Sequence, residues 1–358
     1  MIHVSKPFIP PFSEFAEILK KAWNKAWLAN NGELLRELEK TIRDYLGVKH
    51  LYICSNGTVV LQMALKACGI TKHVITTPFS YVATTNAILL EGCTPVYVDI
   101  SNNSFCMDAG KIEQAITGDT QAIMATHVYG NSCDIEKIET IANKYNLKVI
   151  YDGAHAFGCS YKNRSLLSYG DISTCSFHAT KIFQTAEGGC VITSDDDLAG
   201  KLNLLRQHGH KNDEYLLAGM NAKNSELHAA LGLAVFPYTG KIMENGEKQW
   251  NFYYDSLKKY SLKFLNPRPE MKYNYSYFPV VFDSERILEA CLVRLQSKNI
   301  FPRRYFYPSL NKLPYIEYQP CPVAEDIANR ILCLPLYFNL TEEEQIRICR
   351  VIEETLKN

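Results

Sequence analysis

The feature that most constrains the fold is a regular alternation of short apolar runs with helix-like stretches between residues 47 and 200. The apolar runs cover residues 50–54, 73–77, 95–100, 121–127, 147–151, 173–177 and 190–193, and helix-like stretches stand at 59–67, 81–90, 109–116 and 134–145. Strands that are apolar throughout are buried on both faces, which is typical of a parallel sheet with helices above and below it. The pattern therefore predicts an α/β fold around a mostly parallel sheet.

Beyond residue 240 the chain no longer shows this regular alternation of short apolar runs and helix-like stretches. Helices are expected at 195–206 and 225–235, and beyond residue 240 we expect a long helix at 241–260, a strand at 277–282 and helices at 285–298 and 341–356. A chain of 358 residues is longer than a domain with a single hydrophobic core usually is. We therefore expect a large domain over residues 1–240, with an N-terminal arm, and a smaller C-terminal α+β domain over 241–358.

Composition and charge exclude several classes of protein. Lys and Arg together number 38, and so do Asp and Glu, so the net charge is zero and no basic field for nucleic acid is expected. No apolar run is long enough to span a membrane, and residues 1–13 lack the pattern of a secretory signal. The 12 cysteines are scattered without metal-binding spacing, so we expect buried, reduced thiols, no metal site and a cytoplasmic location.

Polar residues follow three of the predicted strands, where α/β proteins bind their ligands. The first group is Ser55-Asn56-Gly57-Thr58, between a strand and a helix. Gly57 lets the backbone approach a ligand, and the free N–H groups at the start of a helix suit a phosphate. The alternative interpretation is that these residues only cap the helix.

The second group begins with Asp152, directly after the predicted strand 147–151. A carboxylate at that depth requires a partner, because an isolated buried charge is costly. A pyridinium N–H is one such partner, and an Asp that caps the following turn is the alternative. His155 lies in the same segment, where it is either part of a site or a core histidine with its own hydrogen bonds.

The third group is Ser176-Phe177-His178-Ala179-Thr180-Lys181, followed by Glu187-Gly188-Gly189. Burial lowers the pKa of a lysine and makes its amine a nucleophile. A surface lysine in a loop is the alternative. Taken together, an anion site, a carboxylate and an amine at strand ends of one sheet match the three parts that bind pyridoxal phosphate (PLP). We therefore predict a PLP enzyme in which Lys181 forms the Schiff base.

The chain also resembles a known family along most of its length. The resembling segments are residues 27–32, 55–58, 77–84, 127–130, 152–155, 176–181, 187–189, 219–227 and 334–336, in that order. In these segments the sequence is similar to the DegT/DnrJ/EryC1/StrS sugar aminotransferases, which have the PLP-dependent transferase fold type I. Asn56, Val59 and Lys223 depart from the residues usual in that family, which affects expectations about the substrate and not about the cofactor.

The resemblance implies roles around the cofactor ring. Lys181 would bind PLP covalently and later move a proton, and Asp152 would pair with the ring nitrogen. His155 would lie beside the phenolic oxygen of the ring, and Tyr81 would stack on the ring face.

The resemblance also implies roles further from the ring. The phosphate would be held by Gly57, Thr58 and Ser176. Asn221 would reach the phosphate in the neighbouring subunit, which implies a homodimer with shared active sites. Asn31 and Tyr307 are expected to contact the substrate.

The implied reaction is transamination, because Lys181 stands where a dehydratase branch of the family has histidine. Glutamate would convert PLP to pyridoxamine phosphate, which would then aminate a nucleotide-linked ketosugar. Residues 176–189 and 303–308 are most similar to enzymes that make dTDP-4-amino-4,6-dideoxyglucose from dTDP-4-keto-6-deoxyglucose, for bacterial surface polysaccharides such as O-antigen and lipopolysaccharide. Amination at C3 of a dTDP-3-keto-6-deoxyhexose is the alternative, and a non-catalytic regulator with this fold is a more distant one.

Overall fold

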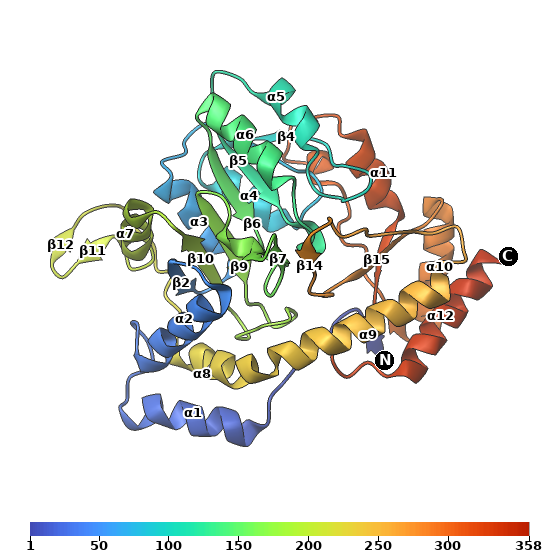
Figure 1. Cartoon of the computed structure of the whole chain (residues 1–358), viewed down its shortest axis with the longest axis horizontal. Coiled ribbons are helices and arrows are strands. Elements are labelled where there is room, and N and C mark those ends of the chain that lie inside the picture. Colours follow the sequence, from blue (N-terminus) through green and yellow to red (C-terminus); the bar gives the residue numbers. More distant parts are fainter. Residues whose placement is uncertain (358) are drawn as a thin grey trace.

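The structure is a computed structural model, and it describes residues 1–357. Its centre is a sheet of seven strands in the order β2-β10-β9-β6-β5-β3-β4 (Figure 1). The strands are β2 (His50–Cys54), β10 (Gly189–Thr193), β9 (Ile172–Ser176), β6 (Lys148–Asp152), β5 (Thr120–Thr126), β3 (His73–Thr76) and β4 (Thr94–Tyr97). All pairs are parallel except those of β10, which is antiparallel to β2 and β9. The predicted α/β fold with a mostly parallel sheet is confirmed.

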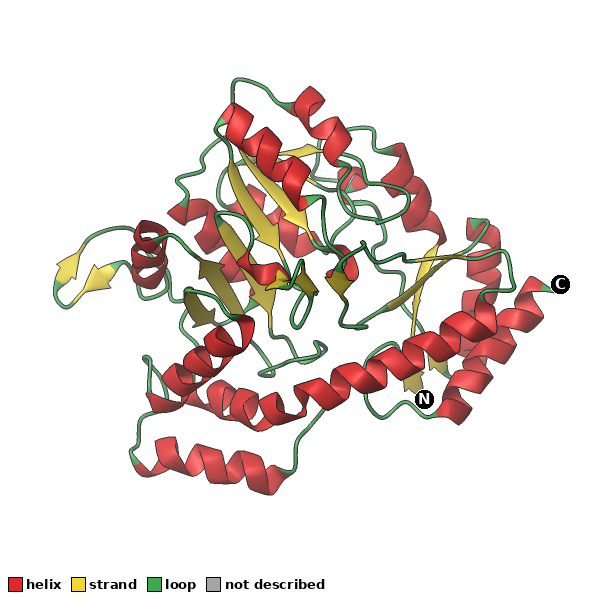
Figure 2. Ribbon diagram, viewed as in Figure 1, coloured by secondary structure: helices red, strands yellow, loops and turns green. Residues whose placement is uncertain are grey.

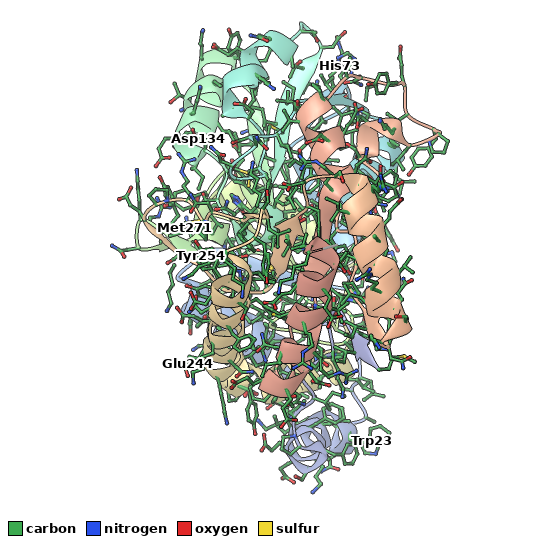
Figure 3. All side chains as sticks on the ribbon, turned by 90° about the vertical axis from the view of Figure 1, so that its right-hand side faces the viewer. Trp23, His73, Asp134, Glu244, Tyr254 and Met271 are labelled. Carbon is green, nitrogen blue, oxygen red and sulfur yellow. The ribbon has the colours of Figure 1, made fainter. Side chains whose placement is uncertain are left out.

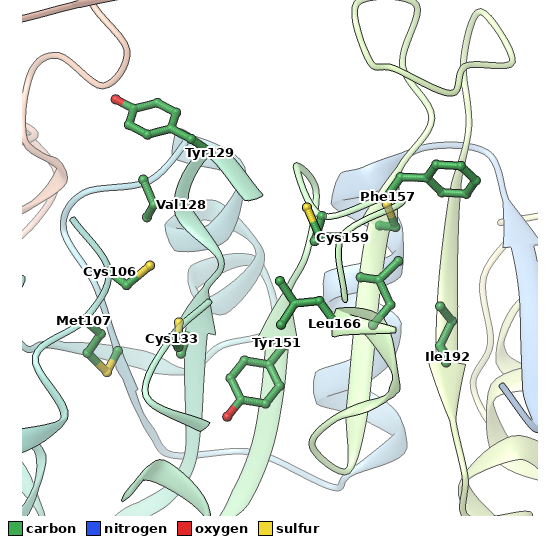
Figure 4. Packing of buried hydrophobic residues seen from close by; sticks show 14 of the residues in the cluster. Cys106, Met107, Val128, Tyr129, Cys133, Tyr151, Phe157, Cys159, Leu166 and Ile192 are labelled. Atoms are coloured by element: carbon green, nitrogen blue, oxygen red, sulfur yellow. The ribbon is translucent and has the colours of Figure 1, made fainter. Parts of the chain in front are cut away.

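Helices cover both faces of this sheet (Figure 2). One face packs on α3 (Gly57–Ala67), α4 (Val82–Leu90) and α7 (Asp196–Leu205), and the other packs on α2 (Glu33–Leu46), α6 (Ile135–Tyr145) and α8 (Glu226–Val235). Alternate residues of β5 join different cores: Ala122 and Met124 lie in the first, Ile123 and Ala125 in the second. Figure 4 shows part of the second core, with Tyr151 of β6 and Ile192 of β10.

The C-terminal part of the chain has a hydrophobic cluster of its own. It contains α9 (Thr239–Leu257), α10 (Glu285–Ser297), α12 (Glu342–Leu356) and an antiparallel sheet of β13 (Lys263–Phe264), β15 (Phe278–Val281) and β17 (Ile331–Leu334). The first strand of the chain, β1 (Ile2–His3), pairs with β16 (Ile300–Phe301) in this part. α11 (Pro322–Arg330) precedes β17. The division at residue 240 falls at the start of α9 and stays a prediction.

Two other expectations from composition can be compared with the structure. All 12 cysteines are free thiols, and all of them except Cys68 are buried, as expected from their apolar surroundings. Within residues 1–357, none of the helices combines the length and the apolar composition that crossing a membrane requires.

The N-terminal helices α1 (Phe12–Asn24) and α2 lie outside the strands and helices that the sequence analysis assigned. Helix α1 buries only Ala22 and packs along α8 (Figure 1). Its residue Trp23 lies near one end of the molecule, with 63% of its surface exposed (Figure 3). Most apolar side chains of α1 stay partly or fully exposed, so the sequence pattern of this helix does not reveal which surface its apolar face covers.

The buried carboxylate of Glu226 fixes the start of α2. The N-cap of α2 is Gly32, which has no side chain to accept hydrogen bonds from the first turn. Glu226, at the start of α8, accepts hydrogen bonds there from the backbone N–H groups of Leu34 (2.8 Å) and Leu35 (3.2 Å). A side chain at residue 32 would collide with this carboxylate, so the glycine and the glutamate depend on each other.

We expect Glu226→Ala to lower the free energy of unfolding of the apo-protein by about 2–4 kcal/mol, because two buried N–H groups lose their acceptor. Urea unfolding followed by circular dichroism measures this. Glu37→Ala is the matched control, since Glu37 lies on α2 in an exposed ion pair with Lys21 (3.4 Å) and should cost about 0.5 kcal/mol or less. Equal unfolding of the two variants would contradict the capping role.

Candidate active site

A cavity of about 260 Å³ opens at the carboxyl ends of β2, β6 and β9. The predicted site residues that line it are Gly57, Thr58, Tyr81, Asp152, His155, Ser176 and Lys181. These residues come from segments that are far apart in the sequence, and the parallel strands bring them to one edge of the sheet. The structure therefore joins most of the predicted site in one place, while the role of each residue stays a prediction.

The start of α3 forms one end of the cavity. The side-chain oxygen of Asn56 accepts a hydrogen bond from the N–H of Val59 (2.8 Å), so Asn56 caps the helix, while Gly57 and Thr58 line the cavity. A Cβ atom on Gly57 would lie 3.0 Å from that of Ser176, which shows how closely the two backbones approach. The helix N-terminus and the Ser176 hydroxyl thus face the same cavity, as an anion site requires.

Asp152 ends β6 and is buried. One carboxylate oxygen accepts a hydrogen bond from the Thr84 hydroxyl (2.7 Å), and the other accepts one from the N–H of Ala154 (3.0 Å). Burial raises the pKa of Asp152, and these hydrogen bonds together with the Lys181 ammonium oppose the rise. Asp152 therefore caps the following turn through the Ala154 N–H, as the alternative interpretation expected, and its carboxylate also lines the cavity.

Lys181 follows β9 in a turn, a few residues beyond the strand end at which it was expected. Its ammonium donates a hydrogen bond to the hydroxyl of Tyr277 (3.1 Å) and lines the cavity. Burial lowers the pKa of Lys181, which favours the neutral amine. The alternative of a surface lysine is therefore wrong.

His155 is a buried histidine on the wall of the cavity. Its Nδ1 atom accepts a hydrogen bond from the N–H of Tyr129 (3.2 Å), and burial lowers its pKa well below the usual value. A neutral imidazole that accepts at Nδ1 carries its proton on Nε2. His155 can therefore donate one hydrogen bond to a ligand oxygen.

Three predicted residues lie outside the cavity lining. Asn221 is exposed and bridges to Gln207, and the Asn31 side chain donates to Gln207 (3.5 Å), with its own side-chain oxygen buried and unpaired. Tyr307 is exposed, and the guanidinium of Arg304 lies 3.5 Å from its ring centre. Their expected contacts with a partner subunit or a substrate stay predictions.

Several residues of the site were missed by sequence reasoning. Tyr277, Arg303, Tyr305 and Phe306 line the cavity, and Thr84 contacts Asp152 behind it. Arg303, Tyr305 and Phe306 lie in the segment that carried the subgroup resemblance, which gave no role to any of them. Tyr277 had no signal, because nothing in the pattern near residue 277 relates it to a lysine in a distant segment of the chain.

The residues present fit PLP. A helix N-terminus and a hydroxyl suit its phosphate, a carboxylate suits its ring nitrogen, a neutral histidine suits its phenolic oxygen, and an amine of lowered pKa suits its aldehyde. The cavity gathers these groups at a single edge of the sheet.

The hydrogen bond from Lys181 to Tyr277 should affect the pKa of Lys181. We expect Tyr277→Phe to lower the pKa of Lys181 further, because a hydrogen bond that favours the ammonium is lost. The pH dependence of the rate at which the apo-protein captures PLP measures this pKa, since only the neutral amine reacts. Tyr275→Phe is the matched control, because Tyr275 packs against Trp250 instead. A midpoint that stays unchanged or rises in Tyr277→Phe would contradict this account.

Comparison with known proteins gives the family. Residues 12–353 match the model of the DegT/DnrJ/EryC1/StrS aminotransferase family. The chain is 38% identical to the dTDP-4-amino-4,6-dideoxy-D-glucose transaminase of Shigella dysenteriae, with 99% of this chain and 98% of that protein covered. It is 33% identical to the GDP-perosamine synthase of Caulobacter vibrioides, with 92% of each covered.

The fold is shared with solved members of the same group. The structure of DesI in the presence of its TDP-sugar product superposes with a TM-score of 0.95 at 29% identity, covering 100% of this chain and 93% of DesI. The resemblance inferred from the sequence and the predicted fold type are thereby confirmed. The chain belongs to the DegT/DnrJ/EryC1/StrS aminotransferase family and is a PLP-dependent sugar aminotransferase.

Proposed function

We propose that this enzyme transfers an amino group from glutamate to C4 of dTDP-4-keto-6-deoxyglucose and so makes dTDP-4-amino-4,6-dideoxyglucose. The observation that carries the proposal is the meeting of Lys181 and Asp152 in one cavity, in a chain that aligns at 38% identity with a transaminase of that name. A non-catalytic regulator would have no need of both groups. The free thiols favour a reaction in the reducing cytoplasm.

Lys181, Asp152 and His155 have different roles in the proposed reaction. Bound PLP supplies a carbonyl that captures amines and a ring that accepts electrons when the neighbouring C–H bond breaks. The lowered pKa of Lys181 supplies a neutral amine for attachment, and after release its Nζ atom carries a proton from one carbon to another. Asp152 holds a proton at the ring nitrogen, and the buried wall around His155 keeps water from the reacting atoms.

The anion site and the cavity mouth account for the remaining roles. Gly57, Thr58 and Ser176 hold the phosphate through the start of α3, and Tyr81 covers a face of the ring from the cavity wall. Because the product is an activated aminosugar, it suits a later glycosyl transfer, as in the surface polysaccharides expected from the sequence.

The acceptor sugar can be tested directly. We expect kcat/KM for dTDP-4-keto-6-deoxyglucose to exceed that for dTDP-3-keto-6-deoxyglucose and for a GDP-linked 4-keto sugar by about tenfold or more, because the pocket discriminates through hydrogen bonds to the sugar. Product NMR identifies the aminated carbon. Lys181→Ala should give no product with any acceptor. Preference for the 3-keto sugar would replace the C4 proposal by the C3 alternative.

The surface around α1 supports a homodimer. Trp27 (54% exposed) and Leu28 lie beside Leu227 at the start of α8, where the Glu226 N–H donates to the Leu28 carbonyl (3.0 Å). The hairpin of β11 (His210–Lys211) and β12 (Glu214–Tyr215) projects from the body and exposes Tyr215 by 82% (Figure 1). Asn31 and Asn221 lie in the same region, bridged by Gln207. Large apolar side chains that are exposed in this way are typical of a covered interface.

Mixing two inactive variants tests whether the sites are shared. In a dimer of one Lys181→Ala chain and one Asn221→Asp chain, one site has both residues intact if Asn221 serves its partner. After unfolding and refolding an equal mixture, half of the dimers are mixed, so activity should recover to about one quarter of wild type. Each variant refolded alone is the control. A mixture no more active than the sum of its parts would contradict the shared site.

A further inference from the structure

Behind the cavity, a chain of buried hydroxyl groups ends on Asp152. The Thr84 hydroxyl lies 2.7 Å from the Asp152 carboxylate and 2.7 Å from the Ser80 hydroxyl. The Thr126 hydroxyl lies 3.1 Å from that of Ser80. All four side chains are buried, and they come from the loop after β3, from α4 and from the ends of β5 and β6. None of the three hydroxyls lines the cavity.

The direction of this chain follows from the number of protons available. Each hydroxyl has one proton to donate, and an ionised carboxylate only accepts. Thr84 therefore gives its proton to Asp152, Ser80 gives its own to Thr84, and Thr126 gives its own to Ser80. Every hydroxyl proton then has an acceptor, and the carboxylate receives a second hydrogen bond from Ala154.

The opposite direction leaves a proton without an acceptor. If Asp152 were protonated and donated to Thr84, then Thr84 would donate to Ser80 and Ser80 to Thr126. Within residues 1–357 the Thr126 hydroxyl is hydrogen-bonded to Ser80 alone, so its proton would be buried without a partner. An unsatisfied buried donor is costly, so the hydroxyl chain disfavours a proton on the Asp152 oxygen that Thr84 contacts. The other oxygen accepts from the Ala154 N–H, which disfavours a proton there, so the two contacts together favour the ionised form.

We propose that Thr84, Ser80 and Thr126 are positioning residues that keep Asp152 ionised and aimed at the ring nitrogen of PLP. This inference rests on the role of Asp152 proposed above. The titratable groups around this carboxylate are Lys181, which favours its charge, and the Cys175 thiol. Burial raises the pKa of Asp152, and the Thr84 hydroxyl opposes that rise together with the Ala154 N–H and Lys181.

A neighbouring residue of α4 provides a closely matched control for this proposal. Thr85 is the next residue of α4, is equally buried, and places its hydroxyl 2.9 Å from that of Tyr97, away from Asp152. Thr84→Val and Thr85→Val therefore remove one buried hydroxyl each from neighbouring positions, with the same change of shape. Only the first removes a hydrogen bond from Asp152.

The experiment reconstitutes each full-length variant with ¹⁵N-labelled PLP. The ¹⁵N chemical shift reports protonation of the ring nitrogen, and titration of the apo-protein gives the Kd for PLP. We expect Thr84→Val to weaken PLP binding about tenfold and to move the ¹⁵N signal toward the unprotonated form. Ser80→Ala should do the same to a smaller extent and Thr126→Val least, while Thr84→Ser should restore both values and Thr85→Val should leave both unchanged.

The outcomes separate this inference from the proposed function. Equal changes in Thr84→Val and Thr85→Val would show a packing effect and overturn the inference. Normal values in Thr84→Val together with a shifted signal in Asp152→Asn would overturn the hydroxyl chain and leave the role of Asp152 intact. If Asp152→Asn kept the wild-type Kd for PLP and the wild-type ¹⁵N chemical shift, Asp152 would not pair with the ring nitrogen, and that part of the proposed function would fall. If Thr84→Val does not fold, the graded effects of Ser80→Ala and Thr126→Val decide the question.

Discussion

The enclosure of an amine and a carboxylate in one cavity at the edge of the sheet is the constraint on which the site depends. Burial moves the pKa of Lys181 down and that of Asp152 up, so each group is pushed toward its neutral form. In the proposed mechanism Lys181 uses that effect, because a neutral amine attacks a carbonyl. Asp152 would have to resist it, because an ionised carboxylate stabilises a proton on a pyridine nitrogen.

The fold provides these opposite environments with nearby elements. Asp152 ends β6 beside Thr126 of β5, and α4 brings Thr84 to it from the other side. Lys181 lies in the turn after β9, where the only polar contact of its ammonium among the described residues is the hydroxyl of Tyr277. The carboxylate is therefore held by two hydrogen bonds, from Thr84 and Ala154, whereas the amine has one and stays free to react.

The sequence predicted those parts of the structure whose signals are local. Apolar runs located all seven central strands, and polar residues at three strand ends located Gly57, Asp152 and Lys181. The reversed direction of β10 could not be predicted, since a buried strand is apolar in either direction. The contacts of Tyr277 and Thr84 depend on packing between distant segments, so no pattern near either residue reveals them.

Other parts have no local signal in the sequence, and the proposed homodimer would account for them. The exposed apolar residues of α1 and the positions of Asn31 and Asn221 outside the cavity make sense together when a second copy covers that surface. The family resemblance supplied these roles, whereas composition and periodicity did not. A helix such as α1 carries a weak local signal when the surface it faces belongs in part to another subunit.

The central claim is that the Lys181 amine attaches the cofactor. Reduction of the PLP-loaded enzyme with borohydride, followed by proteolysis and mass spectrometry, tests it most directly, because reduction makes the attachment permanent. We predict one reduced cofactor per chain, on the peptide that contains Lys181. A cofactor found on another lysine, or none retained after reduction, would contradict the account.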